Sequence, residues 1–255
     1  MIVGVASGLS VESLKPWCAS ARNVYRGPML LLTDTPAKYQ ELTETYGIEM
    51  WFAPLRSDTE GVCGIARTRW KGLADALTDI EPQLPVVFAD TRDVVFQSDP
   101  CALIDTTLVI GTEGKRHEEN AWCMMWLQQL YPNECQQLAP LEVLNAGVIG
   151  GSAGLLRKFA LAVYSELPTI PCDCTAGAMH MTDQTAVNHL VRNGYGTQVQ
   201  IRSDWVFHVR SMDHGRIPAV FHEDSKQLIR ADGEPFPIVH QYDLAPQLSP
   251  LAEIR

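Results

Sequence analysis

Two carboxylates follow directly on an apolar run near the middle of the chain. The apolar stretch Pro85–Ala89 ends at Asp90, Asp93 follows three residues later, and apolar residues resume at Val94. Neighbouring carboxylates repel each other and are costly to bury unless a cation lies between them. Hard divalent ions such as Mg²⁺ and Mn²⁺ bind one or two carboxylates together with substrate phosphates. This pattern predicts a metal–diphosphate site, although a strand-end turn with a capping Asp90 and a paired or exposed Asp93 would also explain it.

Three further stretches place polar side chains at a strand edge, a helix start and a strand end. Asn145 is followed by small residues, which let a ligand approach the backbone closely. Asp183 and Gln184 begin an expected helix, where Asp is also an ordinary N-cap. His240 ends a short apolar strand near the C-terminus, and its imidazole would complete with the two carboxylates a ligand set that suits Mn²⁺. Each stretch also has a structural interpretation: a bulged strand, a helix cap and a hydrogen-bonded structural histidine.

The elements that position these residues alternate between strands and helices in the first half of the chain. The pattern predicts strands over Ile2–Ala6, Met29–Thr33, Ile48–Ala53 and Leu84–Ala89. It also predicts three helices: Val11–Arg22, with Ser10 as N-cap; one that begins at Pro36, with Thr35 as N-cap, and ends at Gly47; and Gly64–Thr78. This order favours a mostly parallel sheet with right-handed crossovers. Open α/β sheets bind ligands at the carboxyl ends of their strands, where Asp90 stands.

The second half of the chain is less regular. We expect strands over Leu108–Gly111, Val143–Ile149 (broken at Ala146-Gly147) and Phe236–His240, and helices over Trp122–Leu130, over Ala153–Leu167 and from Thr182 or Asp183 to about Arg192. No repeat or domain linker is visible, so a single domain is expected over residues 1–255.

Composition narrows the possible partners and compartment. The 255 residues are 46% hydrophobic with a net charge of −10, which argues against a nucleic-acid or anionic-membrane surface. No apolar run approaches the roughly 20 residues of a membrane span, and Met1–Ala6 resembles a strand more than a signal peptide. The seven cysteines are scattered and odd in number, which favours free thiols and a cytoplasmic location. Cys172-Asp173-Cys174 is spaced too tightly for the usual zinc pair.

Taken together and in this order, the four polar stretches resemble the GT-A glycosyltransferases, most closely the retaining group that includes glycogenin and bacterial galactosyltransferases. The family's acidic DxD motif would correspond to Asp90 and Asp93, its Asn-Ala/Ser-Gly-Val strand to Asn145–Val148, its Asp-Gln pair to Asp183-Gln184, and its late metal-binding histidine to His240. The segment Ile65–Arg69 resembles the family's arginine-bearing helix. The resemblance spans roughly residues 1–243.

Two features of the chain depart from the family pattern. The carboxylates are three residues apart, in an Asp-x-Arg-Asp variant of the motif, so direct metal ligation is better matched by Asp93 than by Asp90. The tail after His240 lacks the family's Gly-x-x-Lys-Pro-Trp phosphate-binding segment, so no lysine for the diphosphate can be assigned there.

The resemblance implies a metal-dependent glycosyltransferase that moves a sugar from a nucleotide diphosphate sugar, by expectation a UDP-sugar, to an unknown acceptor hydroxyl with retention. The implied roles are Mn²⁺ or Mg²⁺ ligation by Asp90, Asp93 and His240, sugar contacts and catalysis by Asn145, Asp183 and Gln184, and donor contacts by Ala6, Ser7, Arg67, Arg69, Asp90 and Arg92. The single GT-A domain would comprise a nucleotide-binding half (1–96), a sugar and acceptor half (97–243) and a tail (244–255). Segment 112–142 is where an acceptor would be recognised.

Three other classes share parts of this pattern. A HAD-like phosphatase requires an Asp-x-Asp motif early in the fold. A sugar nucleotidyltransferase usually carries a basic glycine-rich loop after the first strand, and Ser7–Ser10 has no basic residue. A non-catalytic GT-A-like domain that binds carbohydrate or protein would retain the same residues without activity.

Overall fold

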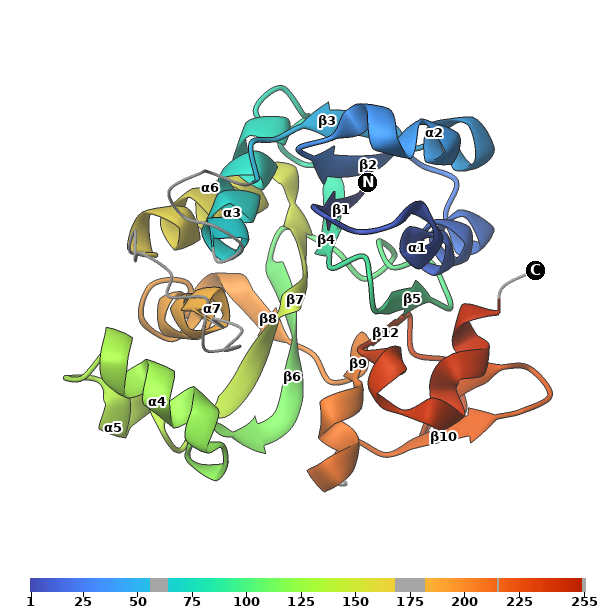
Figure 1. Ribbon diagram of the computed structural model, residues 1–255. Coiled ribbons are helices and arrows are strands. Elements are labelled where there is room, and N and C mark those ends of the chain that lie inside the picture. Colours follow the sequence, from blue (N-terminus) through green and yellow to red (C-terminus); the bar gives the residue numbers. More distant parts are fainter. Residues whose placement is uncertain (56–63, 168–181, 215, 254–255) are drawn as a thin grey trace.

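The computed structural model describes residues 1–55, 64–167, 182–214 and 216–253, and its central element is a mixed sheet. The strands of this sheet, in spatial order, are β3 (Glu49–Phe52), β2 (Met29–Thr33), β1 (Ile2–Ala6), β4 (Pro85–Ala89), β7 (Glu142–Ser152), β6 (Leu108–Arg116) and β8 (Val199–Ile201). All neighbours are parallel except β7, which runs antiparallel to both β4 and β6 (Figure 1). The predicted α/β class with a mixed, mostly parallel sheet is confirmed.

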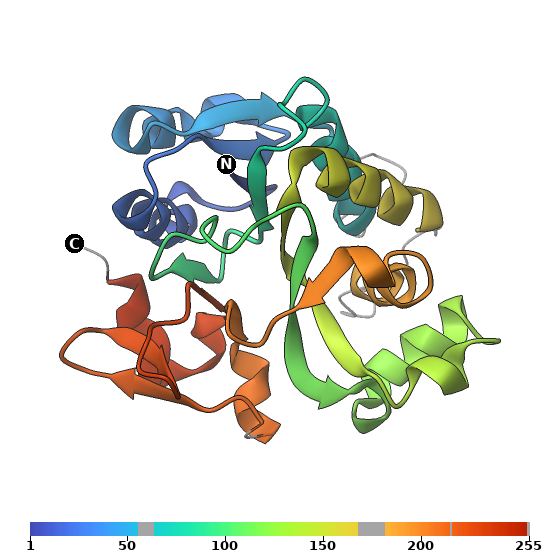
Figure 2. The ribbon, with the colours of Figure 1, turned by 180° about the vertical axis from the view of Figure 1, so that it is seen from behind.

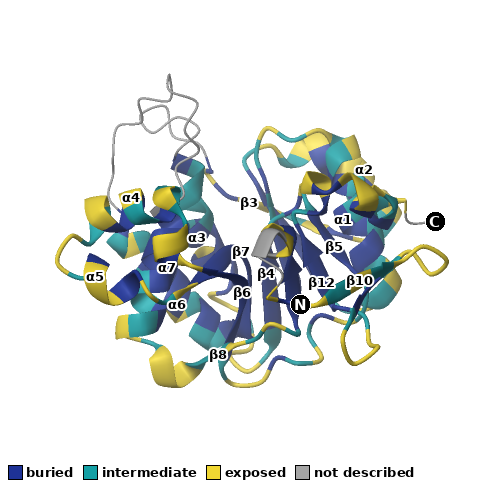
Figure 3. Ribbon diagram, turned by 90° about the horizontal axis from the view of Figure 1, so that it is seen from below, coloured by how far each residue is buried: buried dark blue, intermediate teal, exposed yellow. Residues whose placement is uncertain are grey.

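Helices cover both faces of this sheet. They are α1 (Val11–Val24), α2 (Gln40–Tyr46), α3 (Gly64–Ala76), α4 (Ala121–Leu130), α5 (Cys135–Leu138), α6 (Ala153–Glu166) and α7 (Thr182–Asn193). Successive side chains of a strand point to opposite faces. In β4, Val86 and Phe88 therefore pack with α3, α6 and α7, whereas Val87 and Ala89 pack with α1 and α2. Figure 3 shows the result, a layer of buried strands between helices whose outer surfaces are exposed.

A second, smaller sheet lies beside the central one. It is formed by β5 (Val94–Phe96), β12 (Ile238–His240) and β9 (Val206–His208), with β12 antiparallel to β5 and parallel to β9. The hairpin β10 (Ala219–His222) and β11 (Gln227–Arg230) and the 3₁₀ segments η6 (Val209–His214), η7 (Tyr242–Leu244) and η8 (Pro246–Ala252) complete this part of the chain. Figure 2 shows it as one lobe beside the long strand β6.

Most local signals in the first half of the chain act as expected. The Ser10 Oγ accepts a hydrogen bond from the Ser13 N–H at 3.1 Å and caps α1, which extends to Val24. Gly47 ends α2 in the left-handed conformation, with φ of 63°. Thr35, however, makes no side-chain cap, and the turn that begins at Pro36 is a 3₁₀ helix that leads into α2.

Strands β6 and β7 differ from the prediction. We expected β6 to end at Gly111, but it continues through the polar residues that follow to Arg116. The reason is backbone pairing with β7, which joins Thr112 to Leu144 and Arg116 to Glu142 with register shifts between them. β7 itself is continuous, and the expected break at Ala146-Gly147 is wrong.

The expected nucleotide and sugar halves share one sheet. β4 of the first half pairs with β7 of the second along Pro85–Ala89 and Val148–Ser152. Within the described ranges, no helix is long and apolar enough to cross a membrane. The cysteines that the structure describes are free thiols: Cys18, Cys101, Cys123 and Cys135. Cys172-Asp173-Cys174 lies outside the described residues.

Candidate metal centre and ligand cavity

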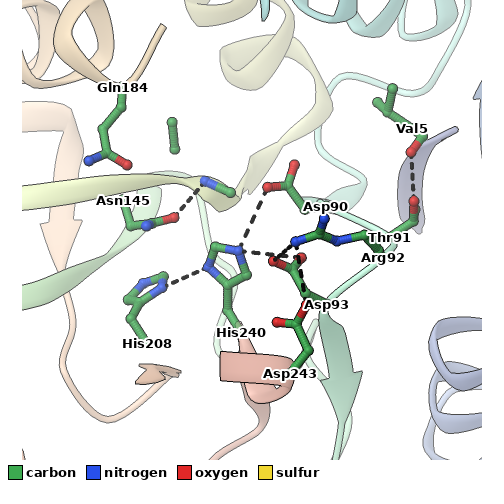
Figure 4. Close-up of polar contacts among 12 residues, drawn as sticks. Val5, Asp90, Thr91, Arg92, Asp93, Asn145, Gln184, His208, His240 and Asp243 are labelled. Carbon is green, nitrogen blue, oxygen red and sulfur yellow. Dashed lines mark hydrogen bonds and ion pairs between the residues drawn. The ribbon is translucent and has the colours of Figure 1, made fainter. Parts of the chain in front are cut away.

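Asp90, Asp93 and His240 converge where the two sheets meet. Asp90 follows β4, Asp93 precedes β5, and His240 ends β12, opposite Val94 in the antiparallel pairing. The His240 Nε2 lies 3.7 Å from Asp90 Oδ2 and 3.7 Å from Asp93 Oδ1 (Figure 4). One ligand atom from each residue falls within 4.8 Å of the other two. The structure thus joins a histidine to carboxylates some 150 residues earlier in the chain, as the sequence predicted.

The electrostatics of this triad favour a cation. Burial raises the pKa of Asp93 above its ordinary value; the facing His240 lowers this pKa, and the Asp90 charge raises it further. The Asp93 side chain is 13% exposed and that of His240 only 3%. Two carboxylate oxygens and an imidazole nitrogen form a donor set that suits Mn²⁺, and Mg²⁺ with its oxygen ligands would use mainly the carboxylates.

A second histidine supports the first. The Nδ1 of His208, at the end of β9, lies 2.9 Å from the Nδ1 of His240, and both rings are buried (Figure 4). Burial and the neighbouring His240 hold the pKa of His208 well below its ordinary value, so the ring is neutral. Metal-binding histidines are commonly oriented through their second nitrogen. Sequence reasoning missed His208, although Val206-Phe207-His208 repeats the apolar-apolar-His pattern of Ile238-Val239-His240.

Gly147 makes room for the triad. A Cβ atom at this position would lie 2.8 Å from Asp90 Oδ2 and 2.8 Å from His240 Nε2. The Gly147 carbonyl also accepts a hydrogen bond from the Asp90 N–H at 2.7 Å. The small residue after Asn145 therefore permits the close approach that the sequence suggested, but the groups approaching it are the expected metal ligands.

Arg69 of α3 ties the triad to α7. Its guanidinium lies 2.6 Å from Asp90 Oδ1 and 2.5 Å from Asp183 Oδ2, and it donates to the Ala146 carbonyl at 3.2 Å. The Trp70 Nε1–H also donates to Asp183 Oδ2, at 3.3 Å. Arg69 is thus a buried cation shared by two carboxylates, and Asp90 keeps its second oxygen for the triad.

The expected sugar-binding amides meet on a buried carboxylate. The Glu113 Oε1 on β6 accepts hydrogen bonds from Asn145 Nδ2 at 2.8 Å and from Gln184 Nε2 at 3.2 Å. Its Oε2 pairs with Lys115 Nζ at 2.8 Å, and the two charged side chains are only 2% and 7% exposed. These contacts fix the orientation of both amides. Sequence reasoning did not single out Glu113 and Lys115, because they lie in the polar stretch after Gly111, which has no strand pattern.

A side-chain clamp positions α7 against β7. The Asn188 amide accepts from the Leu144 N–H at 2.8 Å and donates to the Leu144 carbonyl at 2.7 Å. Its Oδ1 also lies 3.1 Å from His117 Nε2. Asp183 and Gln184 lie in the first turn of the same helix, which begins at Thr182. The contacts of Asn188 with β7 therefore help to position both residues at the site.

The other predicted donor-binding residues lie outside the cavity lining. Arg92 is exposed and its guanidinium lies 3.4 Å from Asp243 and 3.8 Å from Asp93 (Figure 4). Arg67 donates to the Leu167 carbonyl at 3.1 Å and lies 4.0 Å above the Tyr164 ring. At the end of β1, Ala6 is buried in the core and the Ser7 Oγ donates to Asp34 at 2.8 Å. Ala6 and Ser7 are at the carboxyl ends of the parallel strands, but Arg67 points to α6.

The triad and the amides line one cavity of about 240 Å³. The polar side chains around it are Arg69, Asp90, Asp93, Asn145, Asp183, Gln184, Arg210, His240 and Gln241. A larger hollow of about 410 Å³ lies between α1 and the β10–β11 turn, but the lysine there, Lys226, is already paired with Glu253 at 2.7 Å. The groups that could bind a metal or a ligand are concentrated in the smaller cavity.

Comparison with protein-family models and with curated protein sequences finds no match to the chain, so the functional argument rests on the geometry of this cavity.

Proposed function

We propose that the protein is a metal-dependent glycosyltransferase that transfers a sugar from a nucleotide diphosphate sugar to an acceptor hydroxyl. The observation that carries this proposal is the meeting of Asp90, Asp93 and His240 in a cavity that also contains oriented amide side chains. A metal centre alone fits many reactions. A metal centre beside Asn145 and Gln184, whose amides are held by Glu113, also offers hydrogen-bonding groups for a ligand rich in hydroxyls.

Different residues of the chain would act on the leaving group and on the sugar. Asp90, Asp93 and His240 would hold Mn²⁺ or Mg²⁺, which supplies Lewis-acid stabilisation of the departing diphosphate. Gln184 would hydrogen-bond the sugar, with its amide oriented through Glu113. Asp183, locked by Arg69 and Trp70, would accept from a sugar hydroxyl with the lone pairs that these donors leave.

Retention of configuration is the outcome that this arrangement favours. An inverting transfer needs a side chain, such as a carboxylate or a histidine, that is free to act as general base towards the acceptor. The histidine in the cavity lining, His240, belongs to the triad. The carboxylates that line the described part of the cavity are Asp90 and Asp93, which belong to the triad, and Asp183, which is paired with Arg69. None is free to deprotonate an acceptor, which supports the retaining reaction.

A donor screen tests the proposal. The protein is incubated with Mn²⁺ and a panel of UDP- and GDP-sugars, and the released products are identified. Release of UDP or GDP that stops with EDTA is the expected result. A parallel incubation supplies a sugar phosphate and a nucleoside triphosphate, and release of pyrophosphate there would instead indicate a sugar nucleotidyltransferase. Metal-dependent nucleotide binding without turnover would indicate a binding domain, and no binding at all would refute the proposal.

A further inference from the structure

Among the residues that the structure describes, the cations near the proposed site are already paired, with one exception. Arg69 is shared by Asp90 and Asp183, and Arg92 lies beside Asp243. Lys115 is paired with the buried Glu113. Residues 241–254, which follow the last triad member, contain no lysine or arginine. The cations that sequence reasoning assigned to the diphosphate are therefore either neutralised or, like Arg67, directed elsewhere.

Arg210 is the exception. It lies in η6, two residues after His208, and lines the same cavity as the triad. It also borders a neighbouring hollow of about 480 Å³ formed by η6 and residues 244–247. The residue is exposed, and within the part of the chain that the structure describes it makes no ion pair. An unpaired guanidinium is thus available to a ligand in the cavity.

The balance of charges at the site favours an additional cation such as the Arg210 guanidinium for binding a diphosphate. The four aspartates Asp90, Asp93, Asp183 and Asp243 carry four negative charges, and Arg69 and Arg92 offset two of them. A divalent ion would neutralise the remaining two, so the protein and metal together would carry no excess positive charge for a diphosphate. Arginine matches phosphate oxygens well, because its planar guanidinium donates two parallel hydrogen bonds.

We infer that Arg210 is the residue that contacts the diphosphate of the donor and takes the place of the missing lysine after His240. This inference rests on the proposed function, because it requires a diphosphate beside the triad. Sequence reasoning did not single out Arg210. Only the fold brings η6 to the cavity, through the pairing of β9 with β12.

The test compares Arg210→Ala and Arg210→Lys with the parent protein. Calorimetry measures UDP and GDP binding in the presence of Mn²⁺, and electron paramagnetic resonance measures Mn²⁺ binding without nucleotide. Arg210→Ala should weaken Mn²⁺-dependent UDP or GDP binding at least tenfold, as expected for the loss of a charge-assisted hydrogen bond, and leave Mn²⁺ binding unchanged. Arg210→Lys should recover part of the loss. Arg26→Ala, which removes an exposed arginine before the amino end of β2, is the matched control and should bind like the parent.

Two results would overturn the inference in distinguishable ways. If the parent binds Mn²⁺ and nucleotide normally and Arg210→Ala does so within twofold, Arg210 does not contact the diphosphate, while the proposed function stands. If the parent itself binds neither UDP nor GDP with Mn²⁺, the proposed function fails, and the assignment of Arg210 fails with it.

Discussion

Replacing His240 by alanine tests the metal centre most directly. The imidazole is one of three ligand groups in the triad, and its Nε2 lies 3.7 Å from a carboxylate oxygen of each aspartate. The substitution removes that ligand and leaves both carboxylates in place. If His240 binds the metal, His240→Ala should lower Mn²⁺ affinity at least tenfold, which corresponds to about 1.4 kcal/mol.

The same substitution has a predictable cost in stability. His208 Nδ1 is hydrogen-bonded to His240 Nδ1 at 2.9 Å and is fully buried, so truncation of His240 leaves it without a partner. An unsatisfied buried polar group costs about 1–3 kcal/mol. His240→Gln, which keeps a polar group near His208, should lose less stability than His240→Ala while still losing Mn²⁺ affinity, because a neutral amide is a weaker ligand than imidazole.

The assay combines Mn²⁺ titration by electron paramagnetic resonance with urea unfolding of the metal-free protein. His222→Ala, at an exposed position on β10, is the control and should match the parent in both measurements. The reasoning is refuted if His240→Ala folds and binds Mn²⁺ within twofold of the parent. It is equally refuted if His240→Gln keeps full Mn²⁺ affinity, since His240 would then be a structural residue.

Two further predictions concern the buried charges around the site. Because burial raises the pKa of Asp93 in the folded protein, the metal-free parent should lose stability as pH rises through that raised pKa, and Mn²⁺ affinity should fall as pH drops through it. Asp93→Asn should therefore remove this loss of stability, as measured by urea unfolding at several pH values. It should also weaken Mn²⁺ binding more than Asp90→Asn does, because Arg69 already binds one oxygen of Asp90. If Asp90→Asn weakens Mn²⁺ binding more, Asp90 is the principal ligand. Glu113→Gln should destabilise the fold by about 3–5 kcal/mol because Lys115 loses its buried partner, and adding Lys115→Met should recover part of that loss. Additive losses in the double variant, measured by urea unfolding, would show that the two charges do not depend on each other.

Local sequence signals were sufficient for most of the first half of the fold, with the exceptions of the absent Thr35 cap and the unpredicted short strand β5. Alternating apolar strands and capped helices predicted β1, β2 and β4 with little error, because each is buried on both faces and bounded by turn residues. For β6 and β7 they predicted that a strand is present but not how far it extends. The stretch from Thr112 to Arg116 has no apolar pattern, and it is held as a strand by backbone pairing with a partner some 30 residues away.

The sequence by itself singled out Asp90 and Asp93, because neighbouring carboxylates at a strand end are costly to bury without a cation, and it suggested His240 because an imidazole would complete their ligand set. It did not show what else surrounds them. The contact of His208 with His240, the buried Glu113 between two amides and the position of Arg210 at the cavity all depend on how β6, β9 and β12 pair. Tertiary structure also decided which arginines are neutralised. An arginine's local sequence does not reveal its partner, and the partners of Arg69 are Asp90, directly after β4, and Asp183 in α7, 21 and 114 residues further along the chain.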